Sequence, residues 1–278
     1  MKTDKGSFSG QGGLRIHWQS WLPEKVQAVV LIAHGVGEHG GRYGHVAEAL
    51  VGTGCAVYAI DHRGHGQSEG PRCLIDRFAH AVSDMNTMVD RIVEKHARKP
   101  VFLLGHSMGG ALALSYTMKH GERLAGLALS GPAVALDGAP WLLRQISKLL
   151  SLFAPKAGML PVDPTLVSRD AEMVAGYASD PLNFHGKLPA RTIGEIIAFA
   201  EWVPAAVSTI TLPLLVQHGG GDKLAGVSGS RMIAARAGSK DKTLKVYEGH
   251  AHEIFNEPLA DRTRVIADLC AWIKARIA

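Results

Sequence analysis

A serine enclosed by glycines carries the clearest chemical signal in the chain, within Gly105-His106-Ser107-Met108-Gly109. The apolar residues 101–104 before it indicate a buried strand, and a helical pattern follows it as far as Gly121. So tight a turn from strand to helix strains the serine backbone and leaves no room for flanking side chains, which explains the glycines. A chance glycine-serine turn is the alternative. We predict that Ser107 is a nucleophile, with its hydroxyl exposed at a helix N-terminus.

A serine hydroxyl needs a neighbouring base, and that base needs an acid to orient it. Where a serine occupies such a strand-to-helix turn, the chain order is serine, acid, histidine. We predict Asp222 as the acid, because it follows the apolar residues 214–217, and the loop after a strand can deliver a carboxylate. Aspartate beside glycines is also common in ordinary turns, but its position after a strand favours catalysis here.

The residues alone leave the choice of base open. His250 and His252 both follow the strand-like residues 244–247, and only one of them can meet the serine and the acid together. His218 and His185 are weaker candidates, because neither lies in a loop after a final strand.

Attack on an ester carbonyl also requires two backbone N–H groups aimed at the developing oxyanion. One should come from Met108, directly after the nucleophile, and the other from the loop after an earlier strand. That loop is His34-Gly35-Val36-Gly37-Glu38-His39, whose glycines allow the backbone to turn its amides toward a substrate. We predict Val36 as the second donor.

The elements that must position these residues are strands and helices in alternation. Helical spacing of apolar residues from Phe78 to Ile92 predicts an amphipathic helix between two strands. Alternation of this kind indicates right-handed crossovers and a mostly parallel sheet flanked by helices. Short apolar runs predict the buried strands at residues 28–33, 56–60, 101–104, 127–129 and 214–217.

The alternation stops after Ser130-Gly131-Pro132 and returns at Leu212. Residues 135–207 contain helical segments and prolines but no convincing buried strand. Because the strands on both sides are needed for one sheet, we predict an α/β core of residues 1–134 and 208–278 with an inserted helical cap at 135–207.

The first helical stretch of this predicted cap is amphipathic, and its apolar stripe is wide. The stripe would either pack on the other cap helices or lie in a membrane interface, with its cations toward anionic headgroups. Its members at steps of three and four are Leu142, Ile146, Leu149, Leu150 and Phe153, and Trp141 and Leu152 widen it.

Composition excludes several function classes. The net charge of +5 is spread along the chain rather than clustered, so we predict no nucleic-acid partner, although weak attraction to anionic membranes is compatible with it. We predict no cofactor, since cleavage by a serine, a base and an acid requires none. The fourteen histidines include His34, His39, His62 and His65 in glycine-rich loops, but no H-E-x-x-H or comparable ligand spacing exists, so we predict no metal.

Three scattered cysteines imply neither a disulfide framework nor a zinc site. The sequence shows no apolar signal peptide and no stretch long enough to span a bilayer. We therefore expect a cytoplasmic protein whose membrane contact, if any, is peripheral. The oligomeric state is left open.

Several motifs in the same order resemble those of monoacylglycerol lipases. Residues 34–43, HGVGEHGGRY, resemble H-G-x-G-E-H-x-x-R-Y, and residues 61–68, DHRGHGQS, resemble D-H-x-G-H-G-x-S. Residues 105–110 match the G-H-S-M-G-G of this family, and residues 168–170 and 177–182 also resemble it. The likeness extends from about residue 13 to the C-terminus and also covers the wider lysophospholipase-like group.

The resemblance implies the α/β-hydrolase fold and cleavage of a monoacylglycerol to fatty acid and glycerol. It places the acid at Asp222 and the base at the last histidine of residues 247–252, which is His252. It also implies that Val36 and Met108 form the oxyanion hole.

The resemblance further aligns Glu38 and Arg42 with polar residues near the glycerol-binding end of the pocket, although a buried ion pair that braces the loop is an equal alternative. Phe255 departs from the animal enzymes, which carry a histidine there that helps to hold glycerol, so polar recognition must differ.

Two rival functions stay open. A lysophospholipase or a short-chain carboxylesterase would use the same residues on another ester. A ligand-binding protein with a vestigial triad is the rival from another class, and the complete set of Ser107, Asp222 and His252 argues against it.

Overall fold

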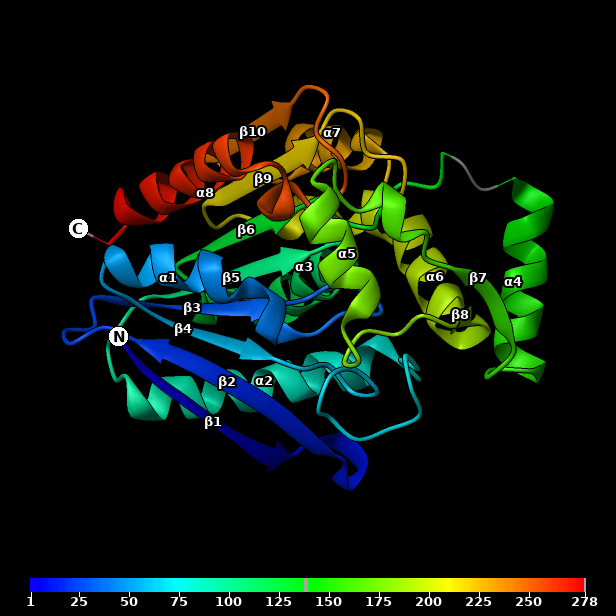
Figure 1. The fold of residues 1–278 in the computed structure, drawn as a ribbon, viewed down its shortest axis with the longest axis horizontal. Helices are drawn as coiled ribbons and strands as arrows, with labels where there is room; N and C mark the ends of the chain where they lie inside the picture. The colour runs from blue at the N-terminus through cyan, green and yellow to red at the C-terminus, as the bar shows by residue number, and fades with distance from the viewer. Residues whose placement is uncertain (138–139, 278) are drawn as a thin grey trace.

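A computed structural model describes residues 1–137 and 140–277 (Figure 1). Its centre is one eight-stranded sheet with the order β1-β2-β4-β3-β5-β6-β9-β10. The strands are β1 (Lys2–Ser9), β2 (Arg15–Leu22), β3 (Ala28–Ala33), β4 (Cys55–Ile60), β5 (Val101–His106), β6 (Gly126–Ser130), β9 (Leu214–Gly219) and β10 (Lys242–Tyr247).

Six neighbouring strands of this sheet are parallel, namely β4, β3, β5, β6, β9 and β10. The strands β2 and β1 extend the sheet as an antiparallel edge. All five strands predicted from apolar runs are confirmed, with ends shifted by at most two residues. The runs are continuous because these strands are buried on both faces. The edge strand β1 was not predicted, because it is mostly exposed and therefore mostly polar.

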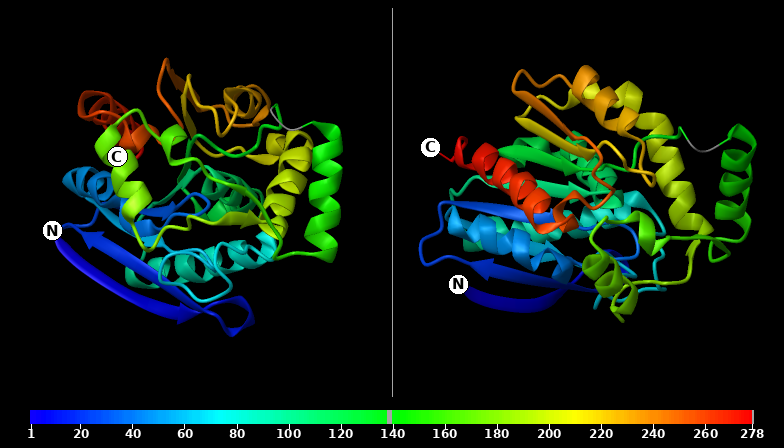
Figure 2. Two further views of the ribbon diagram at one scale, coloured as in Figure 1. Left: turned by 45° about the vertical axis from the view of Figure 1, so that its right-hand side comes forward. Right: turned by 45° about the horizontal axis from the view of Figure 1, so that its top comes forward.

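Helices cover both faces of the sheet (Figures 1 and 2). On one face, α1 (Gly44–Gly52) and α8 (Leu259–Lys274) pack against side chains such as Val30 and Ile32 of β3. On the other face, α2 (Phe78–Lys95), α3 (Met108–His120) and α7 (Val227–Arg236) contribute to a core that includes Val29 and Leu31 of β3. The predicted mostly parallel sheet flanked by helices is thereby confirmed.

The segment between β6 and β9 lies at the carboxyl ends of the parallel strands (Figures 1 and 2). It contains α4 (Trp141–Phe153), β7 (Gly158–Pro161), α5 (Ala171–Ser179), β8 (Lys187–Pro189) and α6 (Ala190–Ala206). β7 and β8 pair with each other in a separate two-stranded sheet, so the segment is not purely helical. These strands have three or four residues and include prolines, which is why no apolar run revealed them.

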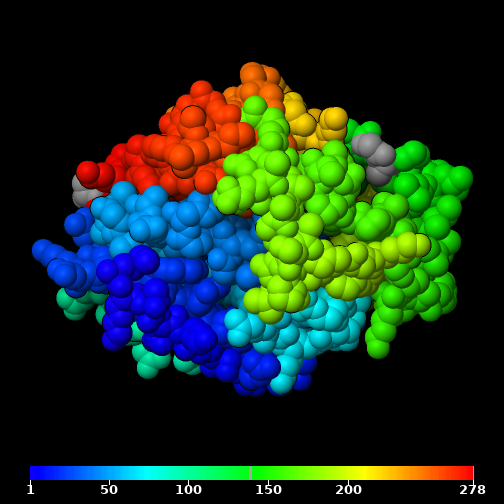
Figure 3. Space-filling view, in the orientation of Figure 1, coloured from blue at the N-terminus to red at the C-terminus, as the bar shows by residue number. Residues whose placement is uncertain are grey.

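Polar contacts fasten the second half of this segment to the rest of the chain. The Arg169 guanidinium pairs with Glu257, with Nε 2.6 Å from the carboxylate oxygen, and the Ser168 hydroxyl donates to the carbonyl of Asn256 at 2.7 Å. His39 Nε2 lies 2.9 Å from a carboxylate oxygen of Asp180. In Figure 3 the residues around 160–190 lie across the front of the molecule.

Candidate active site

The turn between β5 and α3 holds Ser107 in a strained conformation. Its φ of 53° and ψ of −120° lie where non-glycine residues are uncommon. Four backbone hydrogen bonds hold it there: its N–H donates to the carbonyl of Ser130 at 3.0 Å, and its carbonyl accepts from the N–H groups of Gly110 at 2.9 Å, Ala133 at 3.0 Å and Ala111 at 3.2 Å. The surrounding backbone thus keeps the serine at the N-terminus of α3.

The two flanking glycines are required by space. A Cβ on Gly105 would lie 2.5 Å from the carbonyl oxygen of Gly109, and a Cβ on Gly109 would lie 2.1 Å from the carbonyl oxygen of Ala33. Backbone atoms cannot yield to such contacts as the end of a flexible side chain can. Close approach of α3 to β3 therefore depends on glycine.

Asp222 and His252 meet beside this turn. The His252 Nδ1 donates to a carboxylate oxygen of Asp222 at 2.6 Å, and the two side chains are 7% and 0% exposed. Asp222 follows β9 and His252 follows β10, and these two strands are adjacent and parallel. The His252 ring lies against Gly131, where a Cβ would come within 3.3 Å of Nδ1.

The neighbouring His250 points elsewhere. Its Nδ1 lies 3.2 Å from the carbonyl oxygen of Glu248, and its ring packs on Tyr247 with 5.4 Å between centroids. The geometry therefore places His252, and not His250, beside Ser107 and Asp222.

A second histidine contacts the same acid and was not singled out for this from the sequence. His218 Nε2 lies 3.1 Å from the oxygen of Asp222 that His252 contacts, and 2.9 Å from the carbonyl oxygen of Ala225. Its Nδ1 lies 2.6 Å from the hydroxyl of Ser230. His218 belongs to β9 and is fully buried, so sequence spacing carried no signal of this contact.

These contacts shift two ionisation equilibria in a consistent sense. Burial opposes ionisation of Asp222, but hydrogen bonds from His218 and His252 hold the pKa of the carboxyl below its ordinary value. Burial lowers the pKa of His252, but the hydrogen bond and charge of Asp222, together with the charges of Glu253 and Glu38, outweigh burial and raise this pKa above the ordinary value. The pair is arranged to stabilise a protonated imidazole, as a base that accepts a serine proton requires.

Two residues beside Ser107 have backbone N–H groups without an acceptor in the described part of the protein. Across the described residues, the amides of Val36 and Met108 donate to no protein acceptor. Both residues line one cavity with Ser107, and a Cβ on Gly35 would lie only 3.1 Å from Cβ of Ser107. The loop after β3 is therefore close enough to the serine to supply a second oxyanion donor.

Glu38 and Arg42 belong to a buried ion-pair network. Arg42 Nη1 donates to Glu38 at 2.6 Å, and the guanidinium makes two bonds of 2.6 and 2.7 Å to Glu253. The guanidinium also lies 4.7 Å from the ring centroid of Tyr177 in α5. Burial opposes ionisation of Glu38, but Arg42 lowers the pKa of its carboxyl to about 2. Removing one partner from a buried pair costs about 3–5 kcal/mol, so the network braces the loop that carries Val36.

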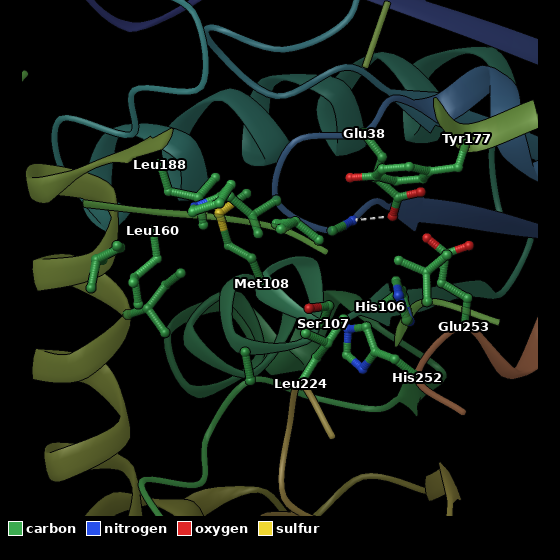
Figure 4. A pocket seen from close by; sticks show the side chains of 18 of the residues that line it. Glu38, His106, Ser107, Met108, Leu160, Tyr177, Leu188, Leu224, His252 and Glu253 are labelled. Carbon is green, nitrogen blue, oxygen red and sulfur yellow. Dashed lines mark hydrogen bonds between the residues drawn. The ribbon is translucent and has the colours of Figure 1, made fainter. Parts of the chain in front are cut away.

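The cavity has an apolar end and a polar end, and its volume is about 290 Å³. Figure 4 shows Ser107 and His252 between Leu160 and Leu188 on one side and the carboxylates of Glu38 and Glu253 on the other. Tyr177 and His106 also line the polar end, whereas Arg42 is not among the lining residues. Val162, Val167, Ile193, Ile196 and Ile197 also line the cavity.

Phe255 does not take part in this cavity. Its side chain is 3% exposed and packs in the core beneath α1 and α8. Glu253, directly after His252, is a polar lining residue that was not predicted from the sequence, as are His106 and Tyr177 (Figure 4). A lone glutamate beside a histidine forms no motif, so spacing could not single it out.

The histidines of the glycine-rich loops pack on one another. The His34 and His62 rings lie 4.5 Å apart, and His34 Nε2 accepts from the N–H of His62 at 2.9 Å. Burial lowers the pKa of the adjacent His65 to about 3. Among residues 1–137 and 140–277, no group of three His, Cys, Asp or Glu is arranged to hold a metal ion. This cluster supports the loop after β3.

A parallel sheet with a strained serine after β5, an aspartate after β9 and a histidine after β10 defines an α/β hydrolase. Residues 24–259 match the family described as serine aminopeptidase, S33. The chain is 41% identical over 273 residues to a monoacylglycerol lipase of Mycolicibacterium smegmatis, with 98% of this chain and 97% of that protein covered.

A monoglyceride lipase of Homo sapiens is 34% identical over 261 residues, covering 93% of this chain and 86% of that one. The crystal structure of a monoacylglycerol lipase from Paleococcus ferrophilus superposes with a TM-score of 0.84 at 27% identity and covers 99% and 100% of the two chains. The chain belongs to this family of serine hydrolases, among the monoacylglycerol lipases, and is a carboxylic ester hydrolase.

Proposed function

We propose that this chain cleaves the ester bond of a monoacylglycerol and releases fatty acid and glycerol. One observation carries the proposal: Ser107 lies between an apolar cavity end suited to an acyl chain and a polar end suited to a hydroxylated head group (Figure 4). The relatives named above act on the same class of lipid ester.

In the mechanism we propose, His252 accepts the proton of Ser107 while Oγ attacks the ester carbonyl. The N–H groups of Val36 and Met108 stabilise the oxyanion, and Asp222 holds the imidazole with its proton on Nδ1. The protonated His252 then gives its proton to the departing glycerol. Water attacks the acyl-enzyme with the same histidine as base, and fatty acid leaves.

A panel of esters tests the substrate. Monoacylglycerols with medium and long chains should give the highest kcat/KM, because they fill both ends of the cavity. Lysophospholipids and short-chain alkyl esters should be cleaved at least about tenfold less efficiently, since each leaves one end mismatched, a difference of about 1.4 kcal/mol. A lysophospholipid preference would favour that rival instead. Absence of a product burst with an activated ester would favour the ligand-binding rival.

We further propose that residues 135–207 form a cap on a core of residues 1–134 and 208–278, and that α4 contacts a lipid surface. The small residues Ser147 and Ser151 form the buried side of α4, and a Cβ on Gly194 of α6 would lie 2.4 Å from the Ser151 hydroxyl. In every view α4 lies at the outer edge, beside α6 (Figures 1 and 2). The apolar stripe faces outward, with exposed Trp141, Leu142, Leu143, Ile146, Leu149, Leu152 and Phe153.

The cations of α4 do not face outward as the sequence suggested. Lys148 Nζ lies 2.6 Å, and an Arg144 Nη1 3.6 Å, from carboxylate oxygens of Glu201 in α6. Apolar contact would therefore dominate binding to lipid. Leu160 of β7 is 57% exposed and also lines the cavity, so apolar surface is also exposed where an acyl chain would enter. No helix of the described residues has the length and apolarity needed to cross a bilayer. We propose a cytoplasmic protein with peripheral membrane contact.

The substitution Leu152→Asp tests this contact. Burying a leucine in lipid contributes about 1.5–3 kcal/mol, so vesicle binding should weaken roughly tenfold or more, together with hydrolysis of aggregated lipid. Hydrolysis of a soluble short-chain ester should be unchanged. Sedimentation with vesicles and both assays measure these effects.

Leu259→Asp is the matched control. Leu259 is 67% exposed, against 66% for Leu152, but it lies at the start of α8, outside the proposed cap. It should leave vesicle binding unchanged. If the folded Leu152→Asp protein sedimented with vesicles to the same extent as the unaltered protein, lipid contact through this residue would be contradicted.

A further inference from the structure

The polar end of the cavity carries more negative than positive charge. One guanidinium, that of Arg42, serves both Glu38 and Glu253, so the three groups together keep one negative charge. Arg42 lies behind the cavity wall with a side chain 9% exposed, whereas both carboxylates belong to the residues that line the cavity. Along the described lining there is no lysine or arginine.

Each carboxylate is also held in place, so its charge cannot turn away. Glu253 receives both guanidinium bonds through separate oxygens, and one of these oxygens accepts a further bond of 2.8 Å from the Asn256 amide. Glu38 accepts bonds of 2.5 Å from the Gly35 N–H and 2.7 Å from the Tyr43 hydroxyl. The charge is therefore preorganised at the surface that a head group would meet.

A head group that occupied this end of the cavity would be largely removed from water. Charges in such a buried site interact more strongly than they do in bulk solvent. A phosphate would meet two carboxylates, with no lysine or arginine among the described lining residues to neutralise its charge. A neutral polyol could donate hydroxyl hydrogens to carboxylate oxygens instead, and a cation would be attracted.

We propose that Glu253 is a specificity-determining residue that makes the head-group end select against anionic esters, so that lysophospholipids with an exposed phosphate are rejected and neutral or cationic esters accepted. The inference rests on the proposed function and deepens it, because it names the residue that separates a monoacylglycerol from a lysophospholipid. If Glu253 instead only braced Arg42, its charge would affect all head groups alike.

Three decanoyl esters with the same reacting bond provide the test: decanoylcholine, monodecanoylglycerol and decanoyl glycerol phosphate, all below their micellar concentrations. For the unaltered protein, kcat/KM corrected for each ester's alkaline hydrolysis rate should fall from choline through glycerol to the phosphate. The Glu253→Gln variant removes one charge and should reduce the glycerol-over-phosphate ratio by about tenfold.

Glu253→Asp is the matched control, because it retains the charge but shortens the side chain. It should preserve the glycerol-over-phosphate ratio even where the absolute rates fall. Equal losses on all three esters in Glu253→Gln, or the same loss of selectivity in Glu253→Asp, would overturn the proposal and leave Glu253 as a brace.

A measurement on the unaltered protein keeps the inference testable if Glu253→Gln does not fold. The 3,3-dimethylbutyl ester of decanoic acid has the shape of decanoylcholine without the charge. A corrected kcat/KM several-fold higher for the choline ester supports the negative field, and equal values refute it. Cleavage of monodecanoylglycerol with no charge selectivity would sink this inference alone, whereas no cleavage of that ester would sink the proposed function.

Discussion

Replacing Ser107 with alanine is expected to lower kcat for monoacylglycerol hydrolysis on the order of a thousandfold or more. The hydroxyl is the atom that would form the acyl-enzyme, and no neighbouring group of the turn can replace it. The alanine variant should retain its fold, because the four backbone hydrogen bonds at residue 107 do not involve the side chain. Turnover with a chromogenic ester and the melting temperature measure the two effects.

An organophosphonate supplies the independent check on the nucleophile. Its mass should appear on the peptide that contains Ser107, and the alanine variant should remain unlabelled. Modification of another serine, or substantial turnover by the alanine variant, would show that the nucleophile has been assigned wrongly.

The second large effect is expected at His252. His252→Ala should lose about as much kcat as Ser107→Ala, because members of a triad act as one unit, and combining the two changes should add little.

Since the base must be neutral to accept a proton, and Asp222 raises the pKa of His252 against the effect of burial, kcat/KM should increase with pH through that pKa.

His250→Ala is the matched control for this residue. Its ring contacts Tyr247 and a backbone carbonyl rather than Asp222, so this variant should keep substantial activity. Steady-state kinetics on both variants decide the point. A reversal, with His250→Ala inactive and His252→Ala active, would move the base to the other histidine.

The sequence by itself determined the parallel core and the tight turn that holds Ser107. Strands buried on both faces must be apolar at every position, so β3 and β9 stand out as continuous runs. The turn at Ser107 tolerates only glycine on either side, because the flanking atoms are backbone. Because these constraints act on residues that are adjacent in the chain, the sequence pattern alone predicts the strands and the turn. The order of serine, acid and histidine came instead from the general rule for such a turn, and the roles of these residues stay predictions.

Only the tertiary structure distinguished residues that are of the same type and lie close together in the sequence but have different neighbours in space. His250 and His252 have the same type and lie in one loop, and resemblance alone favoured one of them; the contact with Asp222 distinguishes them because it depends on where the adjacent strand β9 ends. Glu253 was identified as a cavity residue only from the fold, which places it in the cavity lining, whereas Phe255 packs in the core.

The same reason applies to α4. Helical periodicity shows which residues share a face, but it does not show which face finds a partner. Ser147 and Ser151 allow close approach to Gly194 of α6, so the small polar side is buried and the apolar stripe is exposed. That outcome depends on the shape of a second helix more than forty residues away, which no pattern within α4 could contain.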